Sequence, residues 1–572
     1  MLFKRFLVAA VAVFLFSNVA LFAQVLSLKQ LNKKCFLYQK VEWHINVKGN
    51  WINPYDQDEL VIDMHFTTPS GKQLTLPCFY VSGNSGEASL WAARFAPTEL
   101  GKYTYYCSYK NSKGLISQSK KLSFIANPSK DLGFLRMNTD WTFKTDNGAL
   151  FRGIGENIGW ESRDTDDSKY FKALHENPRF NYDFMLKKLA QNGGNFFRTW
   201  MIYWNLPVDW KQVQNNKRYV NSEKPFNPSG MERLDHVVQL CDSLGIYMML
   251  ALESHVGLMG TGWETSSYNV KNGGFAVTPS DFFGSPNARK QYKNKLRLMV
   301  ARYGYSPSIG AWEFFNEVDN AMYQGKPEEH ISHAVVSDWH REMSSYLKSI
   351  DPFNHIVTTS ISHREIEGLN EIPTIDFNQK HIYCNTLAIP EVITTQKAKY
   401  NKPYVIGEAG YHWDWSIDFN KFGNEFDSHF KLGLWLGIFS PTPVLPMSWW
   451  WEFFEDRGMM SYFKHIKAIN DIMLADSNGS FDLQDVQSIN PKIQCYLVKG
   501  KSKSFLLVVN TSAETQTATI QFANASNLNK NGTEYDTKDG VFNSIQLNEV
   551  HNNKVSLGAL TLEANQFRVF IF

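Results

Sequence analysis

The stretch RLMVARYGYSPSIGAWEFFNE, Arg297–Glu317, joins a helical pattern to a buried-strand pattern. In its first part Met299, Val300 and Tyr303 share one helix face, and Gly304 ends that pattern. The second part, IGAWEFF, is a nearly continuous apolar run, which is typical of a strand covered on both faces. The stretch therefore predicts a helix followed by a buried strand, the repeating unit of a parallel sheet covered by helices.

The same alternation runs from about Asp131 to Asn470. Eight apolar segments separated by helical patterns predict a (β/α)8 TIM barrel over residues 131–475. A doubly wound sheet is the alternative, but no glycine-rich phosphate motif follows the first segment. The eight segments are ALFRGIGEN (149–157), NFFRTWM (195–201), IYMMLALESH (246–255), IGAWEFFNE (309–317), HIVTTSIS (355–362), DFNQKHIYC (376–384), PYVIGEAG (403–410) and VLPMSWWWEF (444–453).

Both flanks of this region change to short segments of period two. Residues 24–128 predict an N-terminal Ig-like β-sandwich, and residues 479–572 predict a small C-terminal β-sandwich. The N-terminal flank carries no cluster of residues suited to acid–base chemistry.

The first 23 residues have the pattern of a bacterial signal peptide. Lys4 and Arg5 precede an apolar run from Phe6 to Phe16, and Ala23 is a small residue suited to cleavage. The run is too short for a membrane span. We therefore expect export to the periplasm or the medium, with no membrane span after cleavage.

Composition limits the classes of partner. The chain has 572 residues, and 58 Lys+Arg against 56 Asp+Glu give a net charge of +2, so no nucleic-acid partner is expected. Aromatic residues make up 15%, including 17 Trp, which large cores explain in part and sugar stacking would also use. No cysteine spacing suggests a metal or redox site, and no cofactor or metal is expected. Buried free thiols are favoured over one bridge among Cys35, Cys78 and Cys107.

Two glutamates follow apolar segments at matching places. Glu317 ends the fourth predicted strand and Glu408 ends the seventh. In a barrel the carboxyl ends of the strands meet at one mouth, so both carboxylates should face the same opening. A lone Asn-Glu pair is usually on the surface, but two such glutamates are hard to explain as scaffold.

The motifs WEFFNEVD and YVIGEAG resemble the acid/base and nucleophile motifs of clan A retaining glycoside hydrolases, which include the family 5 cellulases and mannanases. The resemblance implies that Glu408 is the nucleophile and Glu317 the acid/base. Such a pair needs its carboxyl groups about 5–5.5 Å apart. We expect the Glu408 charge and apolar surroundings to raise the pKa of Glu317.

The same resemblance implies several substrate-binding residues, each with a structural role as the alternative. Asn316 matches an asparagine that binds the sugar 2-hydroxyl, Arg198 an arginine that orients the nucleophile, and Tyr383 a tyrosine that hydrogen-bonds to it. His255 and His381 end the third and sixth strands and are equally compatible with either role. In SWWWEF, Trp450 is the preferred floor of the sugar site, with Trp451 second.

The predicted function is hydrolysis of β-linked bonds in a polysaccharide or oligosaccharide, with β-mannan or β-glucan favoured. Val318 stands where the family 5 motif has proline, which leaves xylan-like and agarose-like polymers open. A non-catalytic carbohydrate-binding protein on a similar barrel is the alternative from another class. A metal-dependent hydrolase is less well supported, because no His/Asp ligand set appears on the first strand.

Overall fold

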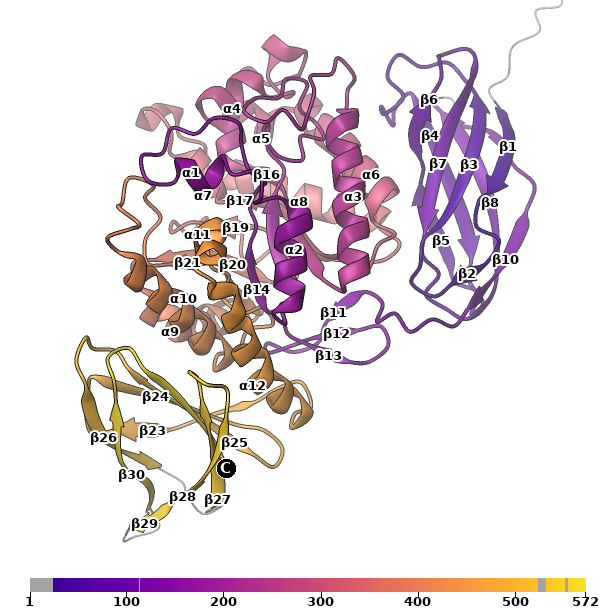
Figure 1. Ribbon diagram of the computed structural model, residues 1–572. Coiled ribbons are helices and arrows are strands. Elements are labelled where there is room, and N and C mark those ends of the chain that lie inside the picture. The colour runs from indigo at the N-terminus through magenta and orange to yellow at the C-terminus, as the bar shows by residue number, and fades with distance from the viewer. Residues whose placement is uncertain (1–23, 113, 523–530, 551–553) are drawn as a thin grey trace, which may run out of the picture.

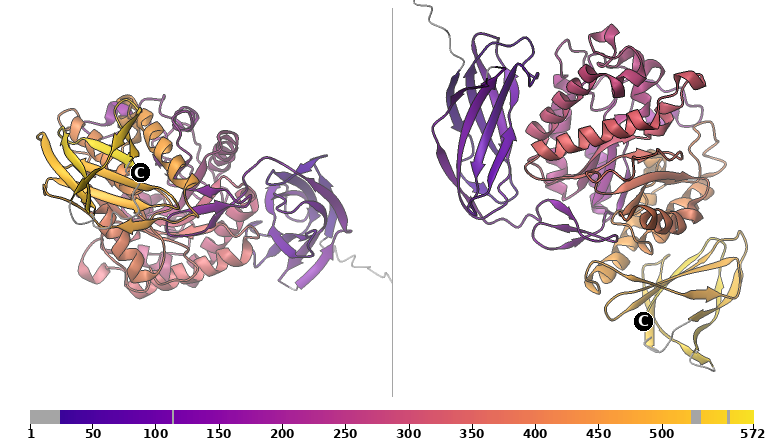
Figure 2. Two further views of the ribbon diagram at one scale, coloured as in Figure 1. Left: turned by 90° about the horizontal axis from the view of Figure 1, so that it is seen from below. Right: turned by 180° about the vertical axis from the view of Figure 1, so that it is seen from behind.

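The structure is a computed structural model that describes residues 24–112, 114–522, 531–550 and 554–572 (Figure 1). A TIM-barrel-like α/β core lies between an N-terminal β-sheet domain and C-terminal antiparallel sheets, as Figures 1 and 2 show. The predicted signal peptide, residues 1–23, lies outside the described residues. Within the described part of the chain, no helix is both long and apolar enough to cross a membrane.

The N-terminal domain consists of two sheets that pack face to face. The strand orders are β1-β3-β7-β6 and β2-β10-β8-β4-β5, with β9 paired to β8. Trp43 of β3 packs against Phe66 of β4 in the other sheet, with ring centroids 5.5 Å apart. The strands are β1 Gln24–Gln30, β2 Cys35–Phe36, β3 Val41–Lys48, β4 Leu60–Thr67, β5 Gln73–Pro77, β6 Phe79–Ser82, β7 Ala88–Phe95, β8 Gly101–Asn111, β9 Gly114–Gln118 and β10 Leu122–Asn127.

Cysteine pairing follows the favoured expectation. All six cysteines are free, and Cys35, Cys78 and Cys107 are buried within the N-terminal domain. The alternative of one bridge among these three is therefore not realised.

Charged side chains join the N-terminal domain to the core. Nη1 of Arg94 donates to Oδ1 of Asp235 at 2.6 Å, and Nη2 of Arg297 donates to the carbonyl of Ile62 at 3.1 Å. Arg94 and Asp235 are both largely buried, so removing either partner would leave a desolvated charge. The domain is therefore tied to the barrel surface through the helices that carry Asp235 and Arg297, as well as through the covalent linker.

The core is built on parallel strands, as the alternation predicts. β14 (Gly155–Asn157), β15 (Phe196–Trp200), β16 (Tyr247–Ser254), β17 (Ile309–Asn316) and β18 (Ile356–Thr358) pair in that order. β19 (Ser360–Ile361), β20 (Asn378–Tyr383) and β21 (Tyr404–Gly410) continue the sheet, and every pairing is parallel.

The eighth predicted strand is not a regular strand. Single parallel bridges from Val444 to Gly153 and from Ser448 to Glu156 and Ala409 link the first and last strands. The chain then leaves the sheet, because Trp450 has a left-handed backbone (φ 71°) and a helix begins at Trp451. Strand alternation therefore does not apply to the three consecutive tryptophans.

Helices cover the outside of this sheet (Figures 1 and 2). Their starts follow the sequence: Asn227 accepts a hydrogen bond from the Ser229 N–H with Pro228 at the first turn, and Ser285 does the same for Ala288 before Pro286. The main helices are α2 Tyr182–Gln191, α3 Pro228–Leu244, α6 Pro286–Tyr303, α8 His333–Ile350, α9 Ile389–Tyr400, α10 Gly423–Ile438 and α12 Phe463–Ala475.

One helix of the expected alternation is absent. Residues 362–377, all of which are described, connect β19 to β20 through turns without a helix. The strict strand–helix repeat predicted from the sequence therefore fails at this one place.

A small antiparallel sheet closes the amino-terminal end of the barrel. It consists of β11 (Leu135–Met137), β12 (Phe143–Thr145) and β13 (Leu150–Phe151). Its apolar side chains join one buried cluster with residues from the starts of the barrel strands, among them Phe196, Tyr247 and Ile356. The open end of the barrel is therefore the end where the strands finish.

The C-terminal region consists of two antiparallel sheets with their own apolar core. Leu506 and Val508 of one sheet share that core with Ile520 and Leu557 of the other. The strand orders are β22-β24-β25-β31-β27-β28 and β23-β26-β30-β29. The strands are β22 Asp482–Gln484, β23 Val486–Ser488, β24 Ile493–Lys499, β25 Ser504–Asn510, β26 Gln516–Phe522, β27 Asn531–Asp536, β28 Phe542–Gln546, β29 Asn548–Val550, β30 Lys554–Leu562 and β31 Phe567–Ile571.

Candidate active site

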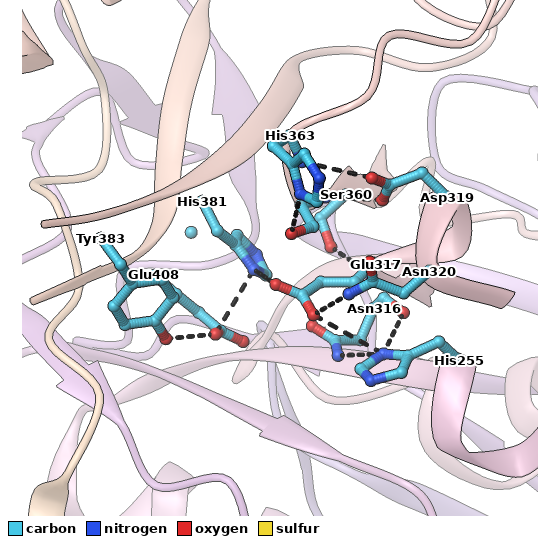
Figure 3. Close-up of polar contacts among 12 residues, drawn as sticks. His255, Asn316, Glu317, Asp319, Asn320, Ser360, His363, His381, Tyr383 and Glu408 are labelled. Carbon is cyan, nitrogen blue, oxygen red and sulfur yellow. Dashed lines mark hydrogen bonds and ion pairs between the residues drawn. The ribbon is translucent and has the colours of Figure 1, made fainter. Parts of the chain in front are cut away.

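Glu317 lies directly after β17, at the open end of the barrel (Figure 3). Its backbone is left-handed (φ 49°, ψ 52°), and its N–H donates to Oγ of Ser360 at 3.0 Å. A short helix, α7 (Val318–Met322), follows at once. This turn stops the strand and leaves the carboxylate at the mouth. The charged residue at the end of the apolar run therefore faces the cavity.

Glu408 lies in β21 and faces the same mouth. The hydroxyl of Tyr383 donates to its Oε2 at 2.6 Å, and Nη1 of Arg198 donates to its Oε1 at 2.8 Å. The carboxylate is almost fully buried. Both predicted neighbours of Glu408 therefore contact it, one on each oxygen.

Arg198 is the centre of a buried polar network. Its Nε and Nη2 donate to the two oxygens of Glu313 at 2.6 and 2.7 Å, and its Nη1 also donates to Oδ1 of Asn157 at 3.0 Å. Burial alone would lower the pKa of Arg198, but the charges of Glu313 and Glu408 hold it above its ordinary value. The sequence reasoning missed Glu313 and Asn157. A glutamate inside an otherwise apolar strand was the available signal for Glu313.

His381 connects the two glutamates. Its Nδ1 lies 2.7 Å from Oε1 of Glu317 and 3.3 Å from Oε2 of Glu408, as Figure 3 shows. One ligand-type atom from each of these three residues lies within 4.8 Å of the others. The carboxylates are thus close enough for one to attack a sugar carbon while the other reaches the leaving oxygen.

The pKa values of the pair differ from the expectation. Burial raises the pKa of Glu317, but His381, with smaller contributions from His255 and Arg198, outweighs burial and lowers that pKa to about 2. Burial raises the pKa of Glu408, and the Glu317 charge adds to this against His381 and Arg198. Burial lowers the pKa of His381, but the two carboxylates raise it above its ordinary value. The expectation that Glu317 has a raised pKa is therefore wrong for this ligand-free arrangement, because it did not count an imidazolium in direct contact.

Asn316, His255 and Asn320 surround Glu317 on its other side. Oδ1 of Asn316 accepts from Nη2 of Arg198 at 2.6 Å, and its Nδ2 donates to Nδ1 of His255 at 3.2 Å. His255 itself lies 3.7 Å from Oε2 of Glu317. Asn320, which the sequence reasoning missed, donates to that oxygen at 2.8 Å. The predicted polar residues therefore converge on one place.

Trp450 and Trp451 do not lie where the sequence reasoning placed them. Each is 1% exposed, neither lines the first cavity, and Nε1 of Trp450 donates to the His412 carbonyl at 2.8 Å. The turn at Trp450 and the helix at Trp451 carry both side chains into the core. Trp449, which precedes the turn, lines the cavity instead.

Two cavities meet at Glu317. The first cavity, about 750 Å³, contains Glu317 and Glu408. Its walls hold six tryptophans: Trp160, Trp200, Trp204, Trp413, Trp415 and Trp449. The second cavity, about 780 Å³, shares Glu317, Asn320, Tyr383 and Trp413 with the first but is not lined by Glu408. Together they form a cleft whose two halves meet at Glu317, with Glu408 in the first half.

Comparison with known proteins assigns two parts of the chain to families. Residues 155–410 match the family described as Cellulase (glycosyl hydrolase family 5), and residues 34–110 match a domain of unknown function, DUF5060. Mannan endo-1,4-beta-mannosidase A of Podospora anserina is 24% identical over 267 residues, which cover 41% of this chain and 65% of that protein. Mannan endo-1,4-beta-mannosidase A of Aspergillus aculeatus is 28% identical over 225 residues, covering 35% of this chain and 55% of that protein.

The chain thus spans less than two thirds of the length of these relatives. A crystal structure from Bacteroides vulgatus ATCC 8482 superposes with a TM-score of 0.62 at 14% identity, covering 94% of this chain and 99% of that one. That likeness extends the shared fold over nearly the whole chain.

Proposed function

The central part of this chain, residues 155–410, belongs to glycoside hydrolase family 5, and from this we infer that the protein hydrolyses β-linked glycosidic bonds with retention of configuration. The observation that carries the proposal is the contact of His381 with both Glu317 and Glu408 at the barrel mouth, which fixes two carboxylates within 4.8 Å. That spacing suits a double displacement, since inverting enzymes separate their carboxylates further to admit a water.

In the first step of the proposed reaction, a carboxylate oxygen of Glu408 attacks the anomeric carbon. A glycosyl ester forms as the bond to the leaving oxygen breaks, and the leaving oxygen takes a proton from Glu317. Arg198 and Tyr383 hold the Glu408 carboxylate in place with the 2.8 and 2.6 Å hydrogen bonds. Because Glu317 has a low pKa while ligand-free, we place its proton on His381 at rest, 2.7 Å from the oxygen that must receive it.

In the second step water attacks the anomeric carbon from the side that the leaving group vacated. Glu317, now a carboxylate, accepts the water proton, and the ester bond to Glu408 breaks. Two inversions restore the β configuration. Asn320 and His255 lie against Oε2 of Glu317, where they support its charge during this step.

For the substrate we favour a β-mannan, because the relatives named above are mannan endo-1,4-beta-mannosidases. β-Glucans and xylan-like or agarose-like polymers are the next candidate substrates. The six tryptophans of the first cavity support a sugar substrate, since an aromatic ring stacks on the apolar face of a pyranose. We further propose that the core is a (β/α)8 barrel in which the helix between β19 and β20 is lost, that the flanking sheets are accessory sandwiches, and that the protein is exported.

A panel of para-nitrophenyl β-glycosides and β-linked polysaccharides tests the proposal. The wild type should release nitrophenol from one of them, and Glu408→Ala should reduce that rate at least a thousandfold. Added azide should restore release in Glu408→Ala and give an α-glycosyl azide, since azide then makes the only displacement. A protein that binds polysaccharide but cleaves nothing in the panel would be the non-catalytic alternative.

Glu317→Ala separates an acid/base from a structural glutamate. Protonation matters for a poor leaving group and little for an activated one, so polysaccharide cleavage should collapse while nitrophenol release survives as a burst. The glycosyl ester should then accumulate, because nothing activates water. Glu391→Ala, an exposed glutamate of α9, is the matched control and should behave as wild type. Equal loss on both substrates without a burst would make Glu317 structural.

A further inference from the structure

The second cavity is the place for the leaving half of the substrate. A sugar attacked by Glu408 must lie in the first cavity, which contains both carboxylates. The group that departs is protonated by Glu317 and lies beyond it, away from the nucleophile. The second cavity contacts Glu317 but is not lined by Glu408, so the leaving group points into it.

The second cavity lies where the chain connects β19 to β20 without the expected helix, and Ser362, His363 and Arg364 of that connection line it. In β20, His381 and Tyr383 point into the barrel, so Lys380 and Ile382 between them point outward. Outward residues of a barrel strand are normally covered by a helix. Here Lys380 and Ile382 line the cavity instead, together with Ala388 and Val392.

The fixed charges of the second cavity are mainly positive. Lys380 and Arg364 line it, and Glu317 is the one acidic side chain among the described lining residues. Within the described chain Nζ of Lys380 has no hydrogen-bond or ion-pair partner, although the side chain is half-buried. His363 also lines the cavity and is exposed.

Arg364 forms a long ion pair with Asp319 and keeps further donors free. Asp319 lies 3.7 Å from Nη1 of Arg364, but it is fully buried and accepts the backbone N–H groups of Ser362 and Arg364 at 2.6 and 3.0 Å. The guanidinium also donates to Oδ1 of Asn320 at 3.1 Å and is over a third exposed. Most of its donors therefore remain available to a ligand.

The first cavity has the opposite character. Besides the two glutamates, Asp166, Asp167 and Asp414 line it, against Arg163 and Lys169. Arg163 is already paired with Asp166. One half of the cleft is thus aromatic and acidic, and the other is basic.

We propose that the leaving half of the natural substrate carries an anionic sugar, a uronic acid carboxylate or a sulfate ester, bound by Lys380 and Arg364. The inference rests on the proposed hydrolysis and adds a substrate class to it. A planar guanidinium and a mobile ammonium on one wall can hold two oxygens of such a group. Lys380 and Arg364 do not repel a neutral sugar. Neutral polymers would therefore still be cleaved, but they would bind more weakly.

Transglycosylation measures this preference, because an acceptor sugar must enter the second cavity to capture the glycosyl ester. With one para-nitrophenyl donor, three acceptors are compared: methyl β-glucuronide, the primary sulfate of methyl β-glucoside, and neutral methyl β-glucoside. Wild type should transfer to one or both charged acceptors about three- to tenfold more efficiently than to the neutral one, the size of one or two partly exposed ion pairs. The ratio should fall as salt is added.

Lys380→Gln and Arg364→Gln should each reduce the charged-to-neutral ratio, and Lys380→Arg should retain it. Lys399→Gln removes a lysine of α9 that is outside the cavity lining and should leave the ratio unchanged. Because the ratio compares charged and neutral acceptors within one variant, a general loss of activity in that variant cancels. A ratio of one in the wild type would overturn the inference, as would a preference that both glutamine variants keep.

Failure of the two proposals can be told apart. Nitrophenol release without any acceptor reports the hydrolysis alone. Calorimetric titration of methyl β-glucuronide against methyl β-glucoside needs no turnover and should show the same preference. If the protein releases no nitrophenol but binds the glucuronide more tightly, the proposed hydrolysis is contradicted and the anion site is supported. If it releases nitrophenol normally but binds both glycosides equally, the hydrolysis is supported and the anion site is contradicted.

Discussion

Nδ1 of His381 lies 2.7 Å from Oε1 of Glu317, and this contact raises the pKa of His381 and lowers the pKa of Glu317. The carboxylates hold the pKa of His381 above its ordinary 6.5, while the imidazole lowers that of Glu317 to about 2. The pair therefore keeps its shared proton to a higher pH than a free imidazole would, and the proton resides on nitrogen until the substrate needs it.

His381→Asn should change the basic limb of the pH profile. In the wild type this limb should report loss of the shared proton above pH 6.5, and an imidazolium limb moves strongly with temperature. In the variant the remaining donor is a carboxyl group, whose ionisation hardly responds to temperature. Profiles of kcat/KM at two temperatures check this. A basic limb with the same temperature dependence in both proteins would show that His381 does not hold the proton.

Glu313→Gln should destabilise the protein because it leaves Arg198 with less counter-charge in a fully buried place. We expect a loss of about 3 kcal/mol in the free energy of unfolding, as for other buried pairs that lose one partner. Glu342→Gln is the control, because its 2.6 Å pair with Arg289 is partly exposed and should cost less than about 1 kcal/mol. Urea unfolding of both variants measures these losses in the free energy of unfolding. Equal costs would mean that Glu313 is not an essential counter-ion.

Trp449→Ala and Trp450→Ala should fail in different ways. Trp449 lines the first cavity, so its loss should lower kcat/KM at least tenfold for the folded protein, in addition to the stability lost with its packing against Trp160 and Trp200. Trp450 is buried beside Phe171 and Phe419, so its loss should lower the free energy of unfolding by about 3–5 kcal/mol. Kinetics on the folded fraction, together with urea unfolding, check both. The reverse result, a loss of kcat/KM in Trp450→Ala and not in Trp449→Ala, would identify Trp450 as the sugar platform.

Glu452 should make stability depend on pH. Its side chain is fully buried, neither carboxyl oxygen has a hydrogen-bond partner among the described residues, and burial raises its pKa to about 8. The folded state then keeps a proton that the unfolded chain loses near 4.5. Stability should therefore fall between these values as pH rises, by up to about 1.4 kcal/mol per pH unit.

Glu452→Leu should reduce this slope and unfold at a higher urea concentration than wild type near pH 8. Glu425→Leu, at an exposed position of α10, should leave the slope unchanged. Urea curves at several pH values give the comparison. An unaltered slope in Glu452→Leu would assign the pH dependence to another group.

Alkylation of Cys384 should block the second cavity. Among the described cysteines Cys384 is the exposed one, and it lines that cavity. Iodoacetamide should therefore inhibit polysaccharide cleavage more than nitrophenyl glycoside cleavage, and faster at higher pH, because partial burial raises the pKa of the thiol. Cys384→Ser should resist inhibition. Inhibition that persists in this variant would place the modified group elsewhere.

The parallel core could be predicted from the sequence because its strands are buried on both faces and read as apolar runs. Glu317 and Glu408 stood out because they interrupt such runs at equivalent places. The turn at Trp450 could not be predicted in this way, since a left-handed tryptophan has no local sequence signal. The low pKa of Glu317 depends on a histidine 64 positions away in sequence, so only the folded structure reveals it.

The missing helix between β19 and β20 also bears on how relatives of this chain diverge. In most of the barrel, a mutation on the outward face of a strand is tested only by how well it packs under a helix. At positions 380 and 382 it is tested by the ligand instead. A lineage could therefore change its preferred polymer by substitutions on this one strand surface, while the glutamate pair and its histidine stay as they are.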